Sequence, residues 1–277
     1  MKSSQTSVNG VSASRLLESR LLESLCAQGD RVVLNAQQSL PLPLADKVIV
    51  LRDGMLAIDA MPAKGKLQVL DFLLAGDVVS SSKILSARKV SLRAITRSSA
   101  IVLQPLDLSP TALEPECWRF LVEQCFNQIT RVNLHQLMTG RLETEARVAS
   151  FILALALREG SLDDRREVLV ALPMSRVDIA NYLVINCDTL SRTMMKFSDG
   201  GVVERVSRHA IRVKDLPALQ KKSPIAGLLA EVVGRMHAPR ADLCLPEARA
   251  ETALRGADCD RTGAHGLAAR APLSAAE

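Results

Sequence analysis

A short stretch of the chain, residues 172–197, carries three side chains that could hydrogen-bond to the edges of DNA bases. Arg192 can donate two parallel hydrogen bonds to O6 and N7 of a guanine, and Asp188 can accept one from a cytosine amino group. Ser191 can lie against a thymine edge. Because residues three and four apart are neighbours on a helix, the three side chains would share one face of it. The spacing therefore predicts a shared polar face with hydrogen-bonding groups that suit base edges.

The residues around this face predict two short helices joined by a tight turn. Ser175 and Asp178 form a capping-box pattern at the start of the first helix, and Asn186 is expected to cap the second. This is the arrangement of a helix-turn-helix, whose second helix enters a DNA major groove. Residues 202–206 and 210–213 follow as a predicted hairpin, which makes the helix-turn-helix a winged one.

The local charge favours a polyanionic partner, double-stranded DNA. Residues 176–214 contain seven Lys or Arg and four Asp or Glu, an excess of positive charge where phosphates would pass. The net charge of +5 and the pI of about 9.0 permit such a partner without requiring one. No paired carboxylates, nucleophile–base pair or phosphate loop stands out, so an enzyme is not expected.

Upstream, residues 28–112 predict a small β-barrel domain, after a polar leader and a short helix within residues 1–27. Short alternating runs separated by turn signals predict strands at 32–34, 47–51, 55–58, 67–70, 90–95 and 100–103. Turns are expected at Asp53-Gly54 and Gly76-Asp77. Spacings near ten residues favour an antiparallel barrel or sandwich over a βαβ fold.

A long helix, residues 113–139, is expected to follow the barrel. Its apolar residues alternate in spacings of four and three, namely Trp118, Val122, Cys125, Ile129 and Val132, with polar residues including Arg131 beside them. This rhythm is typical of a helix that pairs with another helix, and it favours a homodimer. The alternative is a helix packed on its own barrel.

The whole chain is therefore predicted to be an α+β protein with its DNA-binding domain at residues 140–220. A helix at 142–158 opens that domain. Residues 221–277 are predicted to be a largely disordered tail, within which 225–236 could form a short amphipathic helix. No signal peptide or membrane span is visible, so the expected location is the cytoplasm.

The six cysteines are expected to be reduced thiols: Cys26, Cys117, Cys125, Cys187, Cys244 and Cys259. None forms a CxxC pair and no histidine joins them at metal-ligand spacing, so no metal site is predicted. Cys187 lies in the first turn of the second helix, where oxidation would add bulk or charge beside the DNA. It is either a redox switch or a small residue tolerated at the helix start.

This order of parts resembles the CRP/FNR superfamily of bacterial transcription regulators over about residues 30 to 216. LPMSRVDIANYLVINCDTLSRTMMKF is similar to the helix-turn-helix of the FNR and FixK branch. LADKVIVLRDGMLAI and VLDFLLAGDVV resemble the barrel hairpin and the later Gly-Asp turn of the family. ARVASFILALALRE is similar to the helix that precedes its DNA-binding domain. The fold implied is a jelly-roll barrel of the cyclic-nucleotide-binding type, a dimerisation helix and a winged helix-turn-helix.

The resemblance implies roles for individual residues. Asp188, Ser191 and Arg192 would read the bases of a TTGA-type inverted repeat. Contacts to the DNA backbone would come from Ser175, Arg176, Thr189 and, in the wing, Arg208. The family also implies RNA polymerase as a partner and an activator role at genes of oxygen limitation, nitrogen oxides or nitrogen fixation.

Two residues of the helix-turn-helix depart from the family pattern. Asp188 stands where the family usually has glutamate, so its carboxylate reaches less far. Val184 stands where the turn usually holds a glycine. Because a β-branched residue tolerates a left-handed backbone poorly, the turn is predicted to be strained or rebuilt.

The input signal stays open. GDVVSSSKILSARKVSLRAI lacks the acidic residue and the Arg-Ser/Thr-Ala pattern that bind cyclic nucleotides in the family, which disfavours cyclic AMP. Arg88, Lys89 and Arg93 could meet an anion, although a solvated strand edge is the preferred interpretation. The N-terminal cysteine cluster of FNR is missing, which disfavours an iron–sulfur centre, whereas His135 and the cysteines leave haem open. An effector-free FixK-like regulator is the simplest hypothesis. The alternative is a ligand, haem or redox sensor whose barrel or Cys187 gates weak DNA binding.

Overall fold

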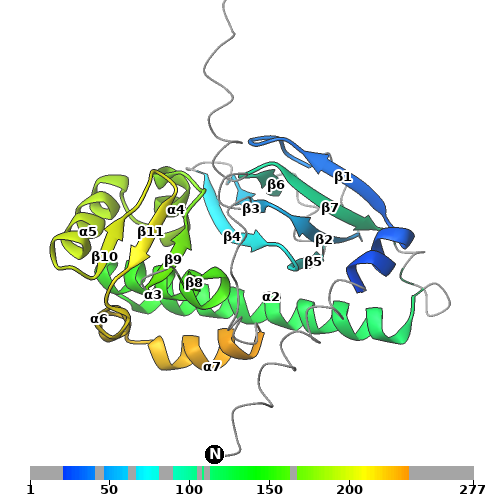
Figure 1. Cartoon of the computed structure of the whole chain (residues 1–277). Coiled ribbons are helices and arrows are strands. Elements are labelled where there is room, and N and C mark those ends of the chain that lie inside the picture. The colour runs from blue at the N-terminus through cyan, green and yellow to red at the C-terminus, as the bar shows by residue number, and fades with distance from the viewer. Residues whose placement is uncertain are drawn as a thin grey trace, which may run out of the picture.

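The computed structural model describes residues 21–40, 47–61, 67–80, 90–104, 108, 113–162 and 167–236. A β-sheet half and a helix-rich half lie side by side, and the long helix α2 runs beneath both (Figure 1). A short helical segment, residues 21–28, precedes the first strand. The expected α+β architecture is confirmed.

The N-terminal half is two antiparallel sheets that face each other. One has the strand order β1-β7-β2-β5 and the other β4-β3-β6. The bounds are β1 Asp30–Leu34, β2 Val48–Asp53, β3 Met55–Ala60, β4 Gln68–Leu74, β5 Val78–Ser80, β6 Val90–Ala94 and β7 Ser98–Leu103. Aliphatic side chains fill the space between the sheets, among them Leu34, Leu51, Leu56 and Leu92. The strands expected from the alternating runs are all present.

The tight turn between β2 and β3 requires its glycine. Gly54 has φ +88°, and a Cβ there would lie 2.5 Å from the carbonyl oxygen of Arg97. A side chain at this position would therefore clash with the neighbouring backbone as well as strain its own. The Asp53-Gly54 turn expected from the sequence is confirmed.

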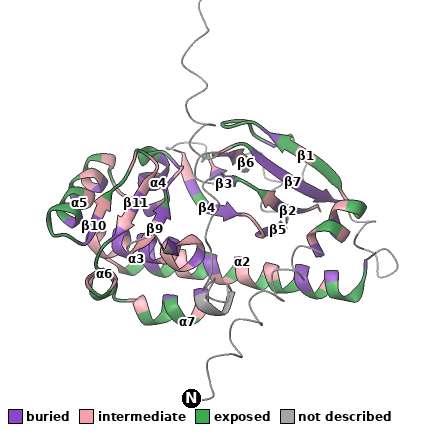
Figure 2. Cartoon of the chain, in the orientation of Figure 1, coloured by how far each residue is buried: buried purple, intermediate pink, exposed green. Residues whose placement is uncertain are grey.

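Helix α2, Pro115–Arg141, contains 27 residues and is about 40 Å long at 1.5 Å per residue. One side of its first half packs on the barrel through Cys117, Phe120 and Leu121. Another side leaves large apolar side chains exposed, namely Val122, Phe126, Ile129, Val132 and Leu137. Figure 2 shows this mixture of buried and exposed residues along α2.

The residues of the predicted pairing seam differ in their burial within the single chain. Trp118 and Cys125 are half-buried against the same apolar cluster as the barrel strands, so they do not belong to the exposed stripe. Phe126, which the spacing analysis passed over, is 63% exposed. Arg131, one of the polar residues beside the predicted seam, is buried.

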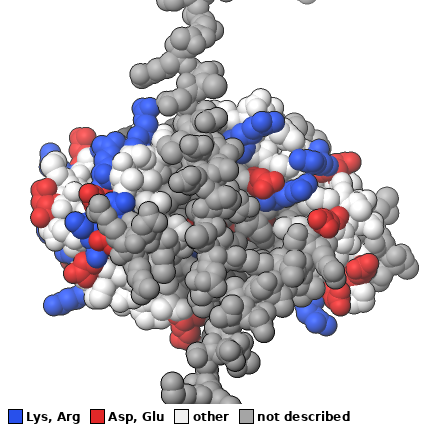
Figure 3. All heavy atoms as spheres, viewed as in Figure 1, with Lys and Arg blue, Asp and Glu red and all other residues white. Residues whose placement is uncertain are grey.

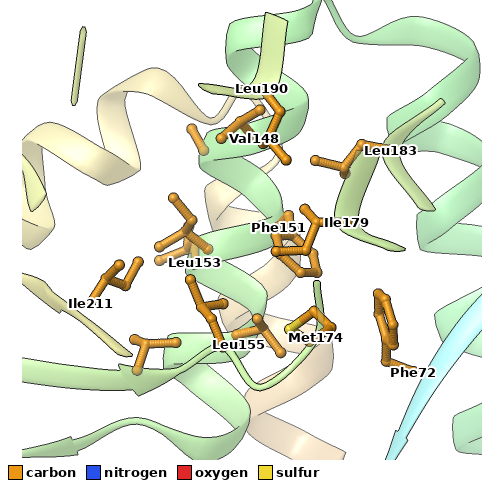
Figure 4. Close-up of a cluster of buried hydrophobic side chains, with 14 of the residues drawn as sticks. Phe72, Val148, Phe151, Leu153, Leu155, Met174, Ile179, Leu183, Leu190 and Ile211 are labelled. Carbon is orange, nitrogen blue, oxygen red and sulfur yellow. The ribbon is translucent and has the colours of Figure 1, made fainter. Parts of the chain in front are cut away.

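The C-terminal half combines helices with a small sheet of order β10-β11-β9-β8. Its elements are α3 Thr144–Glu159, β8 Ser161–Leu162, β9 Val168–Ala171, α4 Arg176–Leu183, α5 Cys187–Asp199, β10 Val203–Arg205, β11 Ala210–Val213, α6 Leu216–Lys222 and α7 Ala226–Met236. Figure 4 shows side chains from these elements pointing toward one another around α3, with Phe72 of β4 at the edge of the cluster. One hydrophobic core thus extends across both halves.

The structure confirms the short amphipathic helix that the sequence offered at residues 225–236. Residues 226–236 form α7, whose Leu229 and Val233 are buried in the main core cluster. Ordered structure therefore continues at least to residue 236. The remainder of the predicted tail lies outside the described residues.

Candidate nucleic-acid interface

The two helices of the helix-turn-helix begin at the predicted caps. The Ser175 hydroxyl accepts from the Asp178 amide at 3.1 Å, and the Asp178 carboxylate accepts from the Ser175 amide at 3.1 Å. Asn186 Oδ1 accepts from the Asp188 amide at 2.9 Å at the start of α5. Since each bond satisfies an amide with no partner inside its helix, these three residues set where α4 and α5 begin.

The turn between the helices is left-handed at Val184, a conformation that a β-branched residue tolerates poorly. Val184 has φ 54° and ψ 48°, a left-handed backbone, and its side chain is 54% exposed. Arg147 of α3 donates to the carbonyl oxygens of Leu183 at 3.2 Å and Val184 at 3.3 Å. This arginine holds a strained turn in place, and no local sequence pattern identifies it because 36 residues separate it from Leu183.

Replacing Val184 with glycine is expected to stabilise the protein by about 1 kcal/mol, because the left-handed region costs an L-residue roughly 1–2 kcal/mol and glycine almost nothing. The exposed valine gives up little packing. The measurement is the urea midpoint of the two proteins. Val184→Ala is the matched control, since it removes the branch but keeps a Cβ, and it should gain less than the glycine. A lower midpoint for Val184→Gly would contradict the strain argument.

Helix α5 presents its predicted base-reading residues on the outside. Asp188 and Arg192 are exposed and Ser191 is half-buried, while Leu190 and Phe197 are buried against the core. Within the described part of the chain, neither the Asp188 nor the Arg192 side chain forms an ion pair. The three side chains therefore lie on a free face of α5, which we call the recognition helix. Figure 3 shows basic and acidic side chains interspersed over this half of the molecule.

The residues expected at the DNA backbone surround the recognition helix. Arg176 is exposed on α4, and its Nη1 donates to Ser191 Oγ at 3.0 Å, which joins a predicted backbone contact to a predicted base reader. Ser175 is exposed at the α4 cap, and Thr189 is half-buried on α5. Arg208 is exposed in the turn between β10 and β11, the wing. All four stand near the N-terminal ends of these helices or on the wing.

At the other end of α5, Lys196 holds the recognition helix to α3, and Lys222 joins α6 to the same α3 carboxylate. Lys196 of α5 and Lys222 of α6 both donate to the Glu145 carboxylate, the latter at 2.8 Å. These bonds lower the pKa of Glu145, with Lys196 contributing most. Lys196 is therefore already engaged by a carboxylate, unlike Arg192.

A salt bridge joins the helix-turn-helix to the barrel. Arg93 of β6 donates to Asp59 of β3 at 2.6 Å and to Asp178 of α4 at 2.8 Å. Only 14% of the Arg93 side chain is exposed, so the interpretation as a solvated strand edge was wrong. Arg93 does meet anions, but they are two carboxylates of the protein itself. Arg88 and Lys89 lie outside the described residues.

Beside this salt bridge, α4 makes aromatic and polar contacts with α2 and β4. The His135 ring of α2 stacks on Tyr182 of α4 with ring centroids 4.2 Å apart. His135 Nε2 lies 2.7 Å from the Tyr182 carbonyl oxygen, a contact that requires a proton on that nitrogen. Gln68 of β4 donates to the Asn181 carbonyl at 2.6 Å. Burial raises the pKa of the Tyr182 hydroxyl, and the charge of Asp71 raises it further. His135, weighed as a haem ligand, thus helps to join α2 to α4.

A buried ionic cluster joins the barrel to α2 and α3. Asp77, in the turn after β4, accepts from Arg131 of α2 at 3.1 Å and from Arg158 of α3. Asp71 of β4 also accepts from Arg131, at 3.1 Å. Burial lowers the pKa of Arg131, but Asp77 and Asp71 raise it by more, so the net shift is upward. The two carboxylates therefore keep Arg131 charged in the interior.

The cysteines and metal donors show no built site in the described ranges. Cys187 is half-buried as the first residue of α5 and packs against the core. Burial raises the pKa of the Cys125 thiol. Among the described residues no group of three or more His, Cys, Asp or Glu could hold a metal ion. Cys244 and Cys259 lie outside those ranges. In the same part of the chain, no helix is both long and apolar enough for a membrane span.

The fold and this site define a DNA-binding transcription regulator with a barrel domain. Residues 146–222 match the Crp-like helix-turn-helix domain. The nitrogen fixation regulation protein FixK of Azorhizobium caulinodans is 30% identical over 64% of this chain and 72% of its own length. The transcriptional regulatory protein btr of Bordetella pertussis is 29% identical over 64% and 73%. The solved structure of FixK2 from Bradyrhizobium japonicum matches with a TM-score of 0.60 at 21% identity, covering 70% of this chain and 97% of that one. The chain belongs to the CRP/FNR family of transcription regulators.

Proposed function

We propose that the protein binds an inverted repeat of TTGA-type half-sites as a homodimer, with Asp188, Ser191 and Arg192 reading the bases. The observation that carries this proposal is the exposed face of α5, where Asp188 and Arg192 have no ion-pair partner among the described residues. The exposed guanidinium of Arg192 can therefore donate to O6 and N7 of the guanine in the half-site. Ser175, Arg176, Thr189 and Arg208 would contact phosphates and orient the helix.

The exposed stripe of α2 supports the dimer. Val122, Phe126 and Ile129 follow one another at spacings of four and three, and each is more than 40% exposed. A second copy of α2 packed on this stripe would bury them as knobs of a helix pair. Two α5 helices, one from each protomer, would then face successive major grooves.

The names of the relatives support a proposal about the kind of gene that is regulated. They include nitrogen fixation regulation proteins and an anaerobic regulatory protein of Pasteurella multocida. We infer that this protein activates genes of oxygen limitation or nitrogen-oxide metabolism in the cytoplasm, in contact with RNA polymerase. Cys187 gives a second candidate, a redox-gated regulator, because oxidation at the first residue of α5 would place new bulk beside Asp188.

The test is a gel-shift titration with a TTGA inverted-repeat duplex. Arg192→Ala is expected to lose about 1–3 kcal/mol of preference for the half-site guanine, because one bidentate contact disappears. Replacing that guanine in the duplex should weaken the wild type equally and should not weaken the variant further. The matched control is Arg119→Ala, an exposed arginine on α2.

Three results would contradict the proposal. They are no shift at any salt concentration, equal binding by Arg192→Ala, and equal affinity for a single half-site and the inverted repeat. The last would leave base reading intact and refute only the dimer.

A further inference from the structure

The helix-turn-helix half contains a cavity of about 330 Å³ beneath the recognition helix, between α5, α3 and the wing. Its floor is apolar and buried, with Phe151 and Ile152 from α3, Leu190 from α5 and Ile211 from β11. Figure 4 shows Phe151, Leu190 and Ile211 around α3. Water on such a floor would find few hydrogen-bond partners, so an apolar occupant is favoured over solvent.

The mouth of the cavity has the opposite character. Three exposed arginines line it: Arg176 of α4, Arg205 of β10 and Arg208 of the wing turn. Arg176 donates to Ser191 Oγ and Arg205 to the Ser207 carbonyl oxygen. Within the described ranges none of the three pairs with a carboxylate, whereas Arg212 nearby pairs with Glu204 and Glu167. The mouth therefore carries positive charge that no carboxylate of the described ranges neutralises, and this charge favours an anion.

We propose that this cavity binds an amphipathic monocarboxylate with a short alkyl chain. The chain would lie on the apolar floor, and the carboxylate would accept paired hydrogen bonds from the arginines at the mouth. A volume of about 330 Å³ lies at the lower end of the range for ligand sites, which suits one alkyl chain. Met174 and Met194 also line the cavity, and their flexible thioethers adapt to such a chain.

A ligand bound in this cavity would compete with DNA for the protein. Arg176, Ser191 and Arg208 line the mouth and also belong to the proposed DNA interface, so this consequence depends on the proposed function. A carboxylate bound there would occupy hydrogen-bond donors that phosphate needs. Because the two anions compete, octanoate at about ten times its own Kd should weaken apparent DNA affinity roughly tenfold.

The binding test is isothermal titration of the full chain with sodium octanoate, without DNA. The neutral comparison is 1-octanol, and acetate tests the head group alone. Octanoate is expected to bind one per chain, octanol at least about tenfold more weakly, and acetate not at all. Arg205→Ala should weaken octanoate binding, because one of the three arginines is lost, and should leave octanol binding unchanged.

A matched pair of variants tests the place of binding. Ala210 of β11 lines the cavity, and Ala171, its cross-strand partner on β9, is exposed and does not. Ala210→Leu should fill the cavity and abolish binding of octanoate and octanol, and Ala171→Leu should change neither. Circular dichroism melting curves verify that both variants fold.

The proposal is overturned if octanoate gives no binding heat, if octanol binds as tightly, or if folded Ala210→Leu binds octanoate undiminished. A gel shift then separates the two proposals. Octanoate binding with no effect on a DNA shift would overturn the antagonism. Octanoate binding by a protein that shifts no duplex would refute the proposed DNA site but not the cavity.

Discussion

Replacement of Asp77 by alanine is expected to lower the free energy of unfolding by about 3–5 kcal/mol, because it removes one side of a buried ionic cluster. Asp77 is 1% exposed, and its carboxylate accepts from Arg131, Arg158 and the Leu74 amide. Alanine would leave both guanidinium groups in the interior without this shared counter-ion. Urea unfolding followed by circular dichroism measures the change, and the fluorescence of Trp118 on α2 reports whether the helix separates from the barrel.

The matched control is Asp53→Ala, another aspartate of the same barrel. Its partner Arg52 is 3.8 Å away and both side chains are well exposed, so the loss should stay below about 1 kcal/mol. In an Arg158→Met background, Asp77→Ala should cost less than in the wild type, since one buried cation has already gone. Equal midpoints for Asp77→Ala and Asp53→Ala would show that the cluster contributes nothing beyond a surface pair.

The Gly-Asp turn shows how far local sequence reaches. Gly76 has φ +91°, so a turn at Gly76-Asp77 follows from residue types alone. The role of Asp77 as a buried counter-ion cannot be predicted from residue types, because Arg131 and Arg158 lie 54 and 81 residues further along the chain. Arg131 illustrates the same limit, since a charged residue beside an apolar stripe is ordinarily solvated. Only the packing of α2 on the barrel turns it inward.

The helix-turn-helix could be predicted almost residue by residue because its signals are local. Ser175, Asp178 and Asn186 each act within three positions of themselves. The strain at Val184 was also predicted from one residue type, but the Arg147 side chain that holds the turn was not. Local signals could not predict which side of α2 packs on the barrel. Adjacent stripes of a helix share the four-and-three rhythm, so spacing alone did not separate barrel-facing Trp118 from exposed Phe126.

Two elements had weak or misleading signals. Strand β9, Val168–Ala171, is a run of four residues with little alternation, too short to tell from a loop. Helix α7 has a helical pattern, but its surroundings are rich in Ala, Gly and Pro and suggested disorder. What stabilises α7 is its packing against α3, which no pattern within residues 226–236 encodes.

Arg93→Ala is expected to cost about 3 kcal/mol of stability, the lower end of the range for a buried pair broken on one side, because the guanidinium keeps some solvent contact. Asp59 and Asp178 would both remain buried, at 3% and 6% exposure, without their cation. Since Arg93 bridges β3 to α4, the helix-turn-helix should also loosen from the barrel. Hydrogen exchange of the α4 amides, followed with urea unfolding, measures both effects.

The pH dependence of this loss follows from the bridge itself. Burial lowers the pKa of Arg93, but the hydrogen bond to Asp59 and the charge of Asp178 raise it by more, so the net shift is upward. A raised pKa means that the contribution of the Arg93 charge is complete below the unfolded-state pKa of arginine and disappears only as the pH climbs through the pKa of the folded state. The cost of Arg93→Ala should therefore be the same at about pH 6 and about pH 9.

Two further variants isolate the contact with the helix-turn-helix. Arg52→Ala removes a partly exposed arginine from β2, a strand of the other barrel sheet, and should cost less than about 1 kcal/mol. Asp178→Asn keeps an oxygen for the Ser175 amide but loses the charge, so combining it with Arg93→Ala should cost less than the sum of the two. Strict additivity would mean that Arg93 stabilises the barrel through Asp59 alone. In that case α4 would be held to the barrel by Gln68 of β4 and to α2 by the contacts between Tyr182 and His135, none of which involves a charged pair.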